Sequence, residues 1–257
     1  MAHSRVMQAK RNRVWLTIAV SSAIAFVVVA LGITEGTLDP LDEQLMLAIE
    51  DTRSPSLNTL MQTVTWAGSY AAAIVAVCLA FLLWRVRGWR DSALRLAVAV
   101  GGAAAYNAPL KTLFARPRPE VIPAMASPET FSFPSGHTTI AVAFYGSLAV
   151  ILWRRDCRTV PVALVMLTMI IGLSRIYLGV HYPSDVLGSL LLGTGWLYIT
   201  TRIRTSGQTH GRRTQGQFRP AQGNTATETR DSTQQRASQE EHGSAHTDNR
   251  SKPSHWK

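Results

Sequence analysis

The chain has 257 residues, of which 46% are hydrophobic and only 16% are charged, with 26 Lys and Arg against 16 Asp and Glu, a formal net charge of +10. Once the polar ends are set aside, the middle is too apolar for an ordinary soluble domain, so we expect an integral membrane protein. The positive charge is spread over short loops and the C-terminal region without interleaved aromatic residues or a groove-binding motif, which argues against a nucleic-acid partner.

Six apolar stretches are candidates for membrane-spanning helices, because about 20 apolar residues cross the roughly 30 Å of hydrocarbon in a bilayer. The first, Val14–Ile33, is longer than the apolar core of a signal peptide, about 7 to 15 residues, so we expect an uncleaved anchor. The others are Trp66–Trp84, Leu96–Ala115, Gly136–Trp153, Thr159–Ser174 and Pro183–Thr201. The expected fold class is therefore all-α: an integral membrane six-helix bundle over residues 14–204.

The third stretch is the weakest of the six. Asn107, Pro109 and Lys111 interrupt its C-terminal end. Polar residues inside a membrane segment usually face a bundle interior or a functional site. We therefore expect this end to line a polar site.

The distribution of Lys and Arg predicts the orientation of the bundle, because cytoplasmic loops carry the excess of positive charge. Basic residues precede the first stretch and follow the second and the fourth: Arg5, Lys10, Arg11, Arg13, Arg85, Arg87, Arg90, Arg95, Arg154, Arg155 and Arg158. This pattern predicts a protein of the plasma membrane whose N-terminus, residues 1–13, lies in the cytoplasm. Lys111, Arg116, Arg118 and Arg175 then fall on the extracytoplasmic side, where phosphate binding would explain them.

Two further segments have distinct patterns. Leu38–Glu50 has Leu41, Leu45, Met46 and Ile49 at three- and four-residue spacing, which predicts a short amphipathic helix that either lies on the outer membrane interface or packs against the bundle. In either position we expect it to cover the site without supplying chemistry. Residues 205–257 have too few apolar side chains to offset the entropy of ordering, and we expect a disordered cytoplasmic tail.

Three short motifs contain the candidate chemistry. Five of the seven histidines lie in the polar termini, whereas His137 and His181 lie at the edges of apolar stretches. The motifs are Lys111-Thr-Leu-Phe-Ala-Arg-Pro-Arg118-Pro119, Pro134-Ser135-Gly136-His137 and Ser174-Arg175-Ile-Tyr-Leu-Gly-Val-His181-Tyr-Pro-Ser-Asp185. In order and residue for residue, they resemble the K-x6-RP, PSGH and SR-x5-H-x3-D signature of the type 2 phosphatidic acid phosphatase superfamily.

The resemblance implies a role for each acid–base residue. His181 would be the nucleophile, attacking phosphorus to form a phosphohistidine that water later hydrolyses. Asp185 would orient it: Pro183 is a favoured first residue of a helix, which puts Asp185 in the first turn, four positions after His181. His137 would be the general acid that protonates the leaving oxygen.

The same motifs offer a phosphate-binding set. Ser135 is a candidate N-cap, and the free N–H groups at a helix start that begins with Gly136 can bind an anion. Lys111, Arg118 and Arg175 would add positive charge. Arg116 is not included, because the family pattern leaves its position open. The chain has neither zinc-ligand spacing nor a Gly-rich nucleotide loop, and carboxylates near the motifs are few, so we expect no metal and no cofactor.

The resemblance therefore implies a membrane phosphatase that hydrolyses phosphomonoester or diphosphate groups of lipid substrates. Similarity to compact members of the superfamily suggests polyprenyl diphosphate, phosphatidate and phosphatidylglycerol phosphate as candidate substrates, with the first slightly favoured because the site is expected to face outward. A lipid-to-lipid phosphotransferase that uses the same histidine is one alternative, and a non-enzymatic lipid-phosphate binding or transport protein is another. No obligate protein partner is expected.

Overall fold

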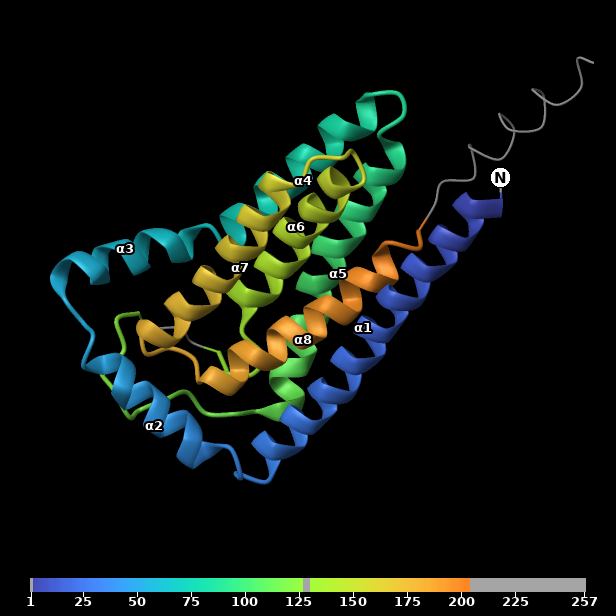
Figure 1. Cartoon of the computed structure of the whole chain (residues 1–257). Coiled ribbons are helices and arrows are strands. Elements are labelled where there is room, and N and C mark those ends of the chain that lie inside the picture. Colours follow the sequence, from blue (N-terminus) through green and yellow to red (C-terminus); the bar gives the residue numbers. More distant parts are fainter. Residues whose placement is uncertain (1, 127–129, 204–257) are drawn as a thin grey trace, which may run out of the picture. The chain divides into compact units, whose positions relative to one another are not determined.

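A computed structural model describes residues 2–126 and 130–203, and these residues form eight helices and no strand (Figure 1). The helices are α1 (Ala2–Thr34), α2 (Asp39–Glu50), α3 (Pro55–Trp66), α4 (Tyr70–Arg85), α5 (Arg90–Phe114), α6 (Gly136–Trp153), α7 (Thr159–Tyr177) and α8 (Pro183–Thr200). The predicted all-α class is confirmed. The tail predicted over residues 205–257 lies outside the described residues.

The described residues contain four stretches that are long and apolar enough to cross a membrane, which makes this a multi-pass membrane protein. They are Arg13–Thr34, Pro55–Arg85, Gly136–Trp153 and Thr159–Tyr177. Helices α5 and α8 occupy the third and sixth predicted spans but do not meet the same criterion of length and composition. The count of six spans therefore stays a prediction.

The second predicted span differs from the structure in a way that concerns the site. Instead of beginning at Trp66, helix α4 begins at Tyr70, after a break that separates it from α3. Ser69 caps α4 by accepting a hydrogen bond from the N–H of Ala71 at 3.2 Å. At Gly68 a Cβ would lie 3.1 Å from the backbone oxygen of His137, so the missing side chain allows the chain to approach the start of α6 closely.

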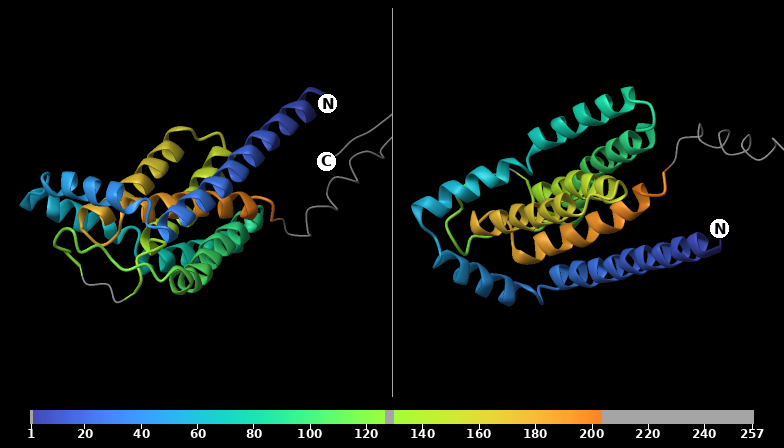
Figure 2. Two further views of the ribbon diagram at one scale, coloured as in Figure 1. Left: turned by 90° about the horizontal axis from the view of Figure 1, so that it is seen from below. Right: turned by 45° about the horizontal axis from the view of Figure 1, so that its top comes forward.

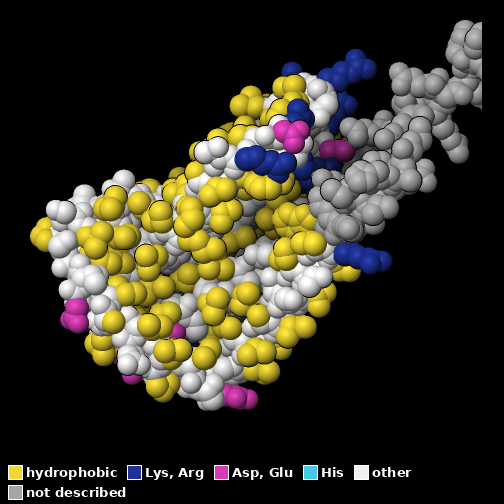
Figure 3. Space-filling view, viewed as in Figure 1, with side chains coloured by type: hydrophobic (Ala, Val, Ile, Leu, Met, Phe, Trp, Pro, Cys, Tyr) yellow, Lys and Arg dark blue, Asp and Glu magenta, His cyan; other side chains and the backbone are white. Residues whose placement is uncertain are grey.

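Helix α6 is the centre of the bundle and contacts α4, α5, α7 and α8, while α1 runs alongside α8 (Figures 1 and 2). Ala72, Ala76 and Ala80 recur every four residues on α4 and are buried against α5 and α6. Small side chains at this spacing let helices approach closely in a membrane. Many large apolar side chains remain on the outer surface, as Figure 3 shows, where lipid would cover them.

The three motifs meet at one end of the bundle. They occupy the C-terminal ends of α5 and α7 and the N-terminal ends of α6 and α8, and α2 lies across this end (Figure 1). Met46 of α2 is fully buried against Ile122, Ile176 and Val186, whereas Leu41 and Leu45 are exposed. Helix α2 thus packs on the bundle through part of its apolar face and leaves the rest outside.

Candidate active site

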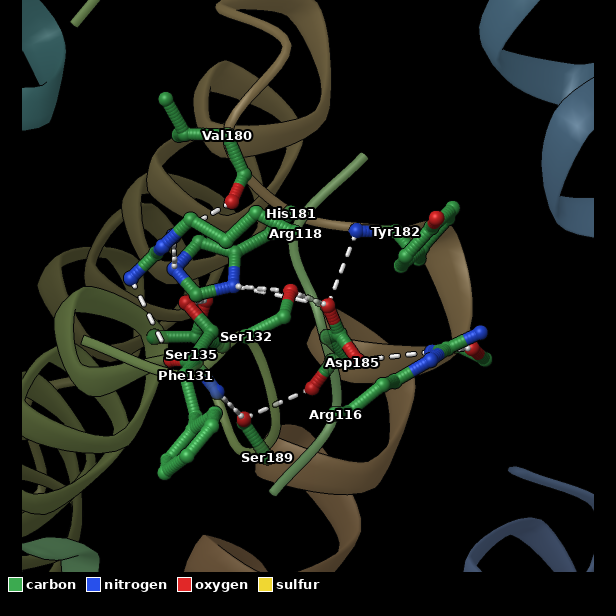
Figure 4. Close-up of polar contacts among 12 residues, drawn as sticks. Arg116, Arg118, Phe131, Ser132, Ser135, Val180, His181, Tyr182, Asp185 and Ser189 are labelled. Atoms are coloured by element: carbon green, nitrogen blue, oxygen red, sulfur yellow. Dashed lines mark hydrogen bonds and ion pairs between the residues drawn. The ribbon is translucent and has the colours of Figure 1, made fainter. Parts of the chain in front are cut away.

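His181 and Asp185 are brought together by the turn between α7 and α8 (Figure 4). Pro183 is the first residue of α8, so Asp185 lies in its first turn. Nδ1 of His181 is 3.5 Å from Oδ2 of Asp185, and both side chains are buried. A carboxylate beside Nδ1 favours a proton on that nitrogen and leaves the lone pair of Nε2 available.

Ser132, in the loop before α6, contacts both members of this pair. Its hydroxyl donates a hydrogen bond to Oδ2 of Asp185 and lies 3.4 Å from Nδ1 of His181. The N–H of Tyr182 donates to the same Oδ2 at 2.9 Å. The sequence does not predict Ser132 as a site residue, because nothing in its local sequence indicates that this loop folds back onto α8.

Arg116 binds the other oxygen of Asp185. Its Nη1 donates to Oδ1 of Asp185 at 2.7 Å, and its Nη2 donates to Oδ2 of Asp42 at 2.9 Å and to Oδ1 of Asp39 at 2.8 Å. Only 6% of the Arg116 side chain is exposed. The sequence motifs do not include Arg116 and predict no chemistry from α2, yet two carboxylates of α2 bind this arginine.

Arg118 lies against the opposite nitrogen of the histidine. Its Nη1 is 3.4 Å from Nε2 of His181, and its Nε donates to the backbone oxygen of Thr130 at 2.7 Å. Burial lowers the pKa of Arg118, and the charge of Asp185 opposes this shift. A guanidinium stays protonated at neutral pH even so, which puts a fixed positive charge beside Nε2.

The protonation of His181 follows from its surroundings. Burial lowers the pKa of His181 to about 4, although the hydrogen bond and the charge of Asp185 act in the opposite direction. The ring is therefore neutral at pH 7. A neutral imidazole with its proton on Nδ1 carries a nucleophilic lone pair on Nε2.

A cavity of about 650 Å³ adjoins this cluster. Its polar walls include Asn107 and Lys111 of α5, as the interrupted third stretch predicted, together with Arg118 and His137. Nζ of Lys111 donates a hydrogen bond to the backbone oxygen of Phe131, which holds the loop over the cavity. The apolar part of the wall consists of Tyr70, Ala104, Pro117, Phe131 and Ile140.

The remaining predicted phosphate ligands differ in their placement. Gly136 lines the cavity. Ser135 is the N-cap of α6 in position, but its hydroxyl makes no cap hydrogen bond; it is fully buried and accepts from Oγ1 of Thr138 at 3.0 Å. The structure therefore does not bring this hydroxyl to the cavity.

Arg175 is buried and donates from Nη1 to Oγ1 of Thr65 on α3 at 2.7 Å. Its Nε is buried and has no hydrogen-bond partner among the described residues. A buried, unpaired N–H of a charged group is costly, so this nitrogen has capacity for an anion. In the described part of the chain, no three His, Cys, Asp or Glu side chains are grouped to hold a metal ion.

The comparisons with known proteins agree with the motifs. Residues 92–207, which include all three motifs, match the PAP2 superfamily. Phosphatidylglycerophosphatase B of Bacillus subtilis is 31% identical over 182 residues, which cover 68% of this chain and 88% of that protein. The chain belongs to the PAP2 superfamily.

Other members of the PAP2 superfamily resemble it in sequence and in fold. Decaprenylphosphoryl-5-phosphoribose phosphatase of Mycobacterium tuberculosis is 39% identical over 124 residues, 41% of this chain and 66% of that protein. The crystal structure of the transmembrane PAP2 type phosphatidylglycerolphosphate phosphatase from Bacillus subtilis superposes with a TM-score of 0.66 at 27% identity, over 71% of this chain and 94% of that chain. The protein is thus a membrane phosphatase of the PAP2 superfamily.

Proposed function

We propose that this PAP2 protein hydrolyses phosphate groups of membrane lipids through a covalent phosphohistidine on His181. The observation that carries the proposal is the arrangement around the ring: Nδ1 faces Oδ2 of Asp185 at 3.5 Å, and Nε2 faces Arg118 at 3.4 Å. Nε2 forms a bond to phosphorus while the bond from phosphorus to the lipid oxygen breaks. Asp185 stabilises the positive charge that develops on the ring.

His137 is the proposed proton donor for the leaving oxygen. It lies in the first turn of α6 and lines the cavity beside Gly136. In the second step water attacks phosphorus, the bond between phosphorus and Nε2 breaks, and His137 takes the proton from the water. One histidine thus serves as acid and then as base, which returns the site to its starting state.

The charge on the transferring phosphoryl group needs fixed cations and N–H donors. Arg118 and Lys111 line the cavity, and Arg175 has the unpaired Nε. The N-terminal end of α6 at Gly136 adds backbone N–H groups with the helix dipole behind them. Ser135, which the sequence predicts as a ligand, is left out of the proposed set, because its N–H donates to Oγ of Ser189 at 2.7 Å and its hydroxyl accepts from Thr138. No metal enters the proposed mechanism.

A lipid-borne substrate fits the composition of the cavity. Cationic side chains form one part of its wall and apolar side chains the other, and Tyr70 at its edge is 79% exposed. The relatives act, by name, on phosphatidylglycerophosphate and on a decaprenyl-linked phosphate. We propose polyprenyl diphosphate, phosphatidylglycerol phosphate and phosphatidate as the substrates to test, in that order.

The proposed placement in the plasma membrane puts the active site outside and both polar termini inside. Arg85 ends α4, and the turns after α4 and after α6 carry Arg87, Arg154 and Arg155. The Lys and Arg side chains in Figure 3 gather at the end of the bundle away from α2. This end would face the cytoplasm under the positive-inside rule. Residues 1–13 and 205–257 would then be cytoplasmic.

The test is phosphate release by the purified full chain in detergent with EDTA present, from each of the three lipids. We expect release by the wild type and by His210→Ala, a control in the polar C-terminal region, and none by His181→Ala. After quenching in alkaline detergent, in which a phosphohistidine is stable, phosphorus-32 from a labelled substrate should remain on the wild type and not on His181→Ala. Full activity of His181→Ala would overturn the proposal.

Two other outcomes distinguish the alternatives. Labelling of His181 with little release of orthophosphate, and transfer of the label to a second lipid when this acceptor is added, would identify a phosphotransferase. Saturable binding of lipid phosphates by a folded wild type that neither becomes labelled nor releases phosphate would identify a binding or transport protein.

A further inference from the structure

Asp185 uses its two oxygens for different purposes. Oδ2 receives the hydroxyl of Ser132 and the N–H of Tyr182 and faces His181. Oδ1 receives Nη1 of Arg116 at 2.7 Å. Because the carboxylate has no solvent exposure, its charge needs a buried partner, and Arg116 is the guanidinium in contact with it.

We propose that Arg116 is a positioning residue for the phosphatase reaction: it fixes the rotation of the Asp185 carboxylate and compensates its charge, so that Oδ2 stays directed at Nδ1 of His181. Figure 4 shows Arg116 on one side of Asp185, with Ser132 and His181 on the other. Arg116 does not line the cavity, and it acts on His181 through its contact with Asp185. This inference rests on the proposed role of His181 and Asp185.

Arg116 is itself held by a second set of contacts. Its Nη2 binds Asp42 and Asp39 of α2, and its guanidinium carbon lies 4.0 Å from the centre of the Tyr182 ring. Ala115, the residue before Arg116, caps α5 with φ of 44° in the left-handed region, so the chain leaves the helix just before Arg116. Asp42 also accepts from the N–H of Ser184 at 2.9 Å, at the start of α8. A continuous set of contacts therefore runs from α2 through Arg116 to Asp185 and His181.

A purely structural alternative makes a different prediction. If Arg116 only attached α2 to the bundle, its loss would lower stability or alter the cavity independently of Asp185. Effects of residues that act as one unit are not additive, whereas independent effects multiply. A double-mutant cycle between the two residues therefore separates the two explanations.

The experiment measures kcat and KM of wild type, Arg116→Gln, Asp185→Asn and the double variant, with His181→Ala as the inactive reference. We expect Arg116→Gln to lose about 10- to 100-fold in kcat with little change in KM, as for residues that orient a reacting group. The double variant should lose no more than Asp185→Asn alone. Each variant is first checked for folding by its melting temperature in detergent; if Arg116→Gln does not fold, Arg116→Lys, which keeps the charge, replaces it in the same cycle.

Three results would overturn the inference: losses that multiply in the double variant, a loss confined to KM, or wild-type kcat in either single variant. Any of these with an inactive His181→Ala would leave the proposed phosphohistidine on His181 intact, although wild-type kcat in Asp185→Asn would also remove the proposed role of Asp185. An active His181→Ala would overturn both.

Discussion

Nη1 of Arg118 lies 3.4 Å from Nε2 of His181, so the nitrogen proposed to attack phosphorus already has a cation against it. The same guanidinium is held by Thr130, Phe131 and Val180. Arg118 lines the cavity, whereas His181 is buried and does not, so we expect a phosphate in the cavity to contact Arg118 first. The planar fork of an arginine can bind a phosphate oxygen and keep a loop contact at the same time.

Arg118→Lys should lower kcat/KM for lipid phosphate by about 10²- to 10³-fold, because an ammonium is a point charge that cannot replace the fork or its loop contacts. The measurement is steady-state phosphate release. Arg158→Lys is the matched control, since Arg158 is 56% exposed and pairs only loosely with Asp156 at 3.6 Å. Equal activity of the two variants would contradict the role of Arg118 at the phosphate.

Ser132→Ala should lower kcat by about tenfold and leave KM nearly unchanged. The hydroxyl that donates to Oδ2 of Asp185 would be lost, and a hydrogen bond to a charged group contributes about 1.5–3 kcal/mol. Ser147→Ala is the control, because the buried hydroxyl of Ser147 has no hydrogen-bond partner among the described residues. We expect Ser147→Ala to keep activity and to melt at the same or a higher temperature. A Ser132→Ala enzyme with wild-type kcat would show that Asp185 does not need this donor.

Acid should destabilise the protein through His181. The pKa of this ring is about 4 in the folded protein and near about 6.5 in an unfolded chain, so between these values the unfolded state binds more protons. The free energy of unfolding should therefore fall as pH decreases from 6.5 to 4, and His181 should contribute no change above pH 7.

The check is the melting temperature in detergent at pH 7.5, 6.5, 5.5 and 4.5. Between pH 6.5 and 4.5 the melting temperature of the wild type should fall by more than that of His181→Asn, which cannot take up this proton. Parallel curves for the two proteins would contradict a buried, neutral His181.

Gly179→Ala should destabilise the turn that delivers His181. The residue has φ of +72°, a region that costs an L-residue about 1–2 kcal/mol, and its Cβ would lie 3.0 Å from the backbone oxygen of Pro123. Gly195→Ala in α8 is the control, since a Cβ there meets nothing within 4 Å and should stabilise the helix by about 0.5–1 kcal/mol. The melting temperature should fall in Gly179→Ala and rise in Gly195→Ala, and activity should be reduced only in Gly179→Ala. A loss of activity in Gly195→Ala would show that the difference between the two variants does not depend on the turn.

Local sequence was sufficient for most of the helices and for the contact between His181 and Asp185. Apolar length predicted α6, α7 and α8 closely, and the C-terminal end of α1, because a single apolar run in a membrane satisfies its own backbone hydrogen bonds as a helix. The break between α3 and α4 was not predicted, because it depends on Gly68 packing against the backbone of His137, which belongs to a distant segment.

The sequence by itself determined the family, the all-α fold class and the identity of the motif residues, since these depend on residue type and on spacings of a few positions. Only the tertiary structure decided which other groups join them. Arg116 and Asp42 are 74 positions apart, and Ser132 and Asp185 are 53 apart. Such contacts form when helices pack and bury charge. A buried, unpaired carboxylate is strongly destabilising, so Asp185 needs a cation and a hydroxyl beside it, and no local pattern specifies which residues supply them.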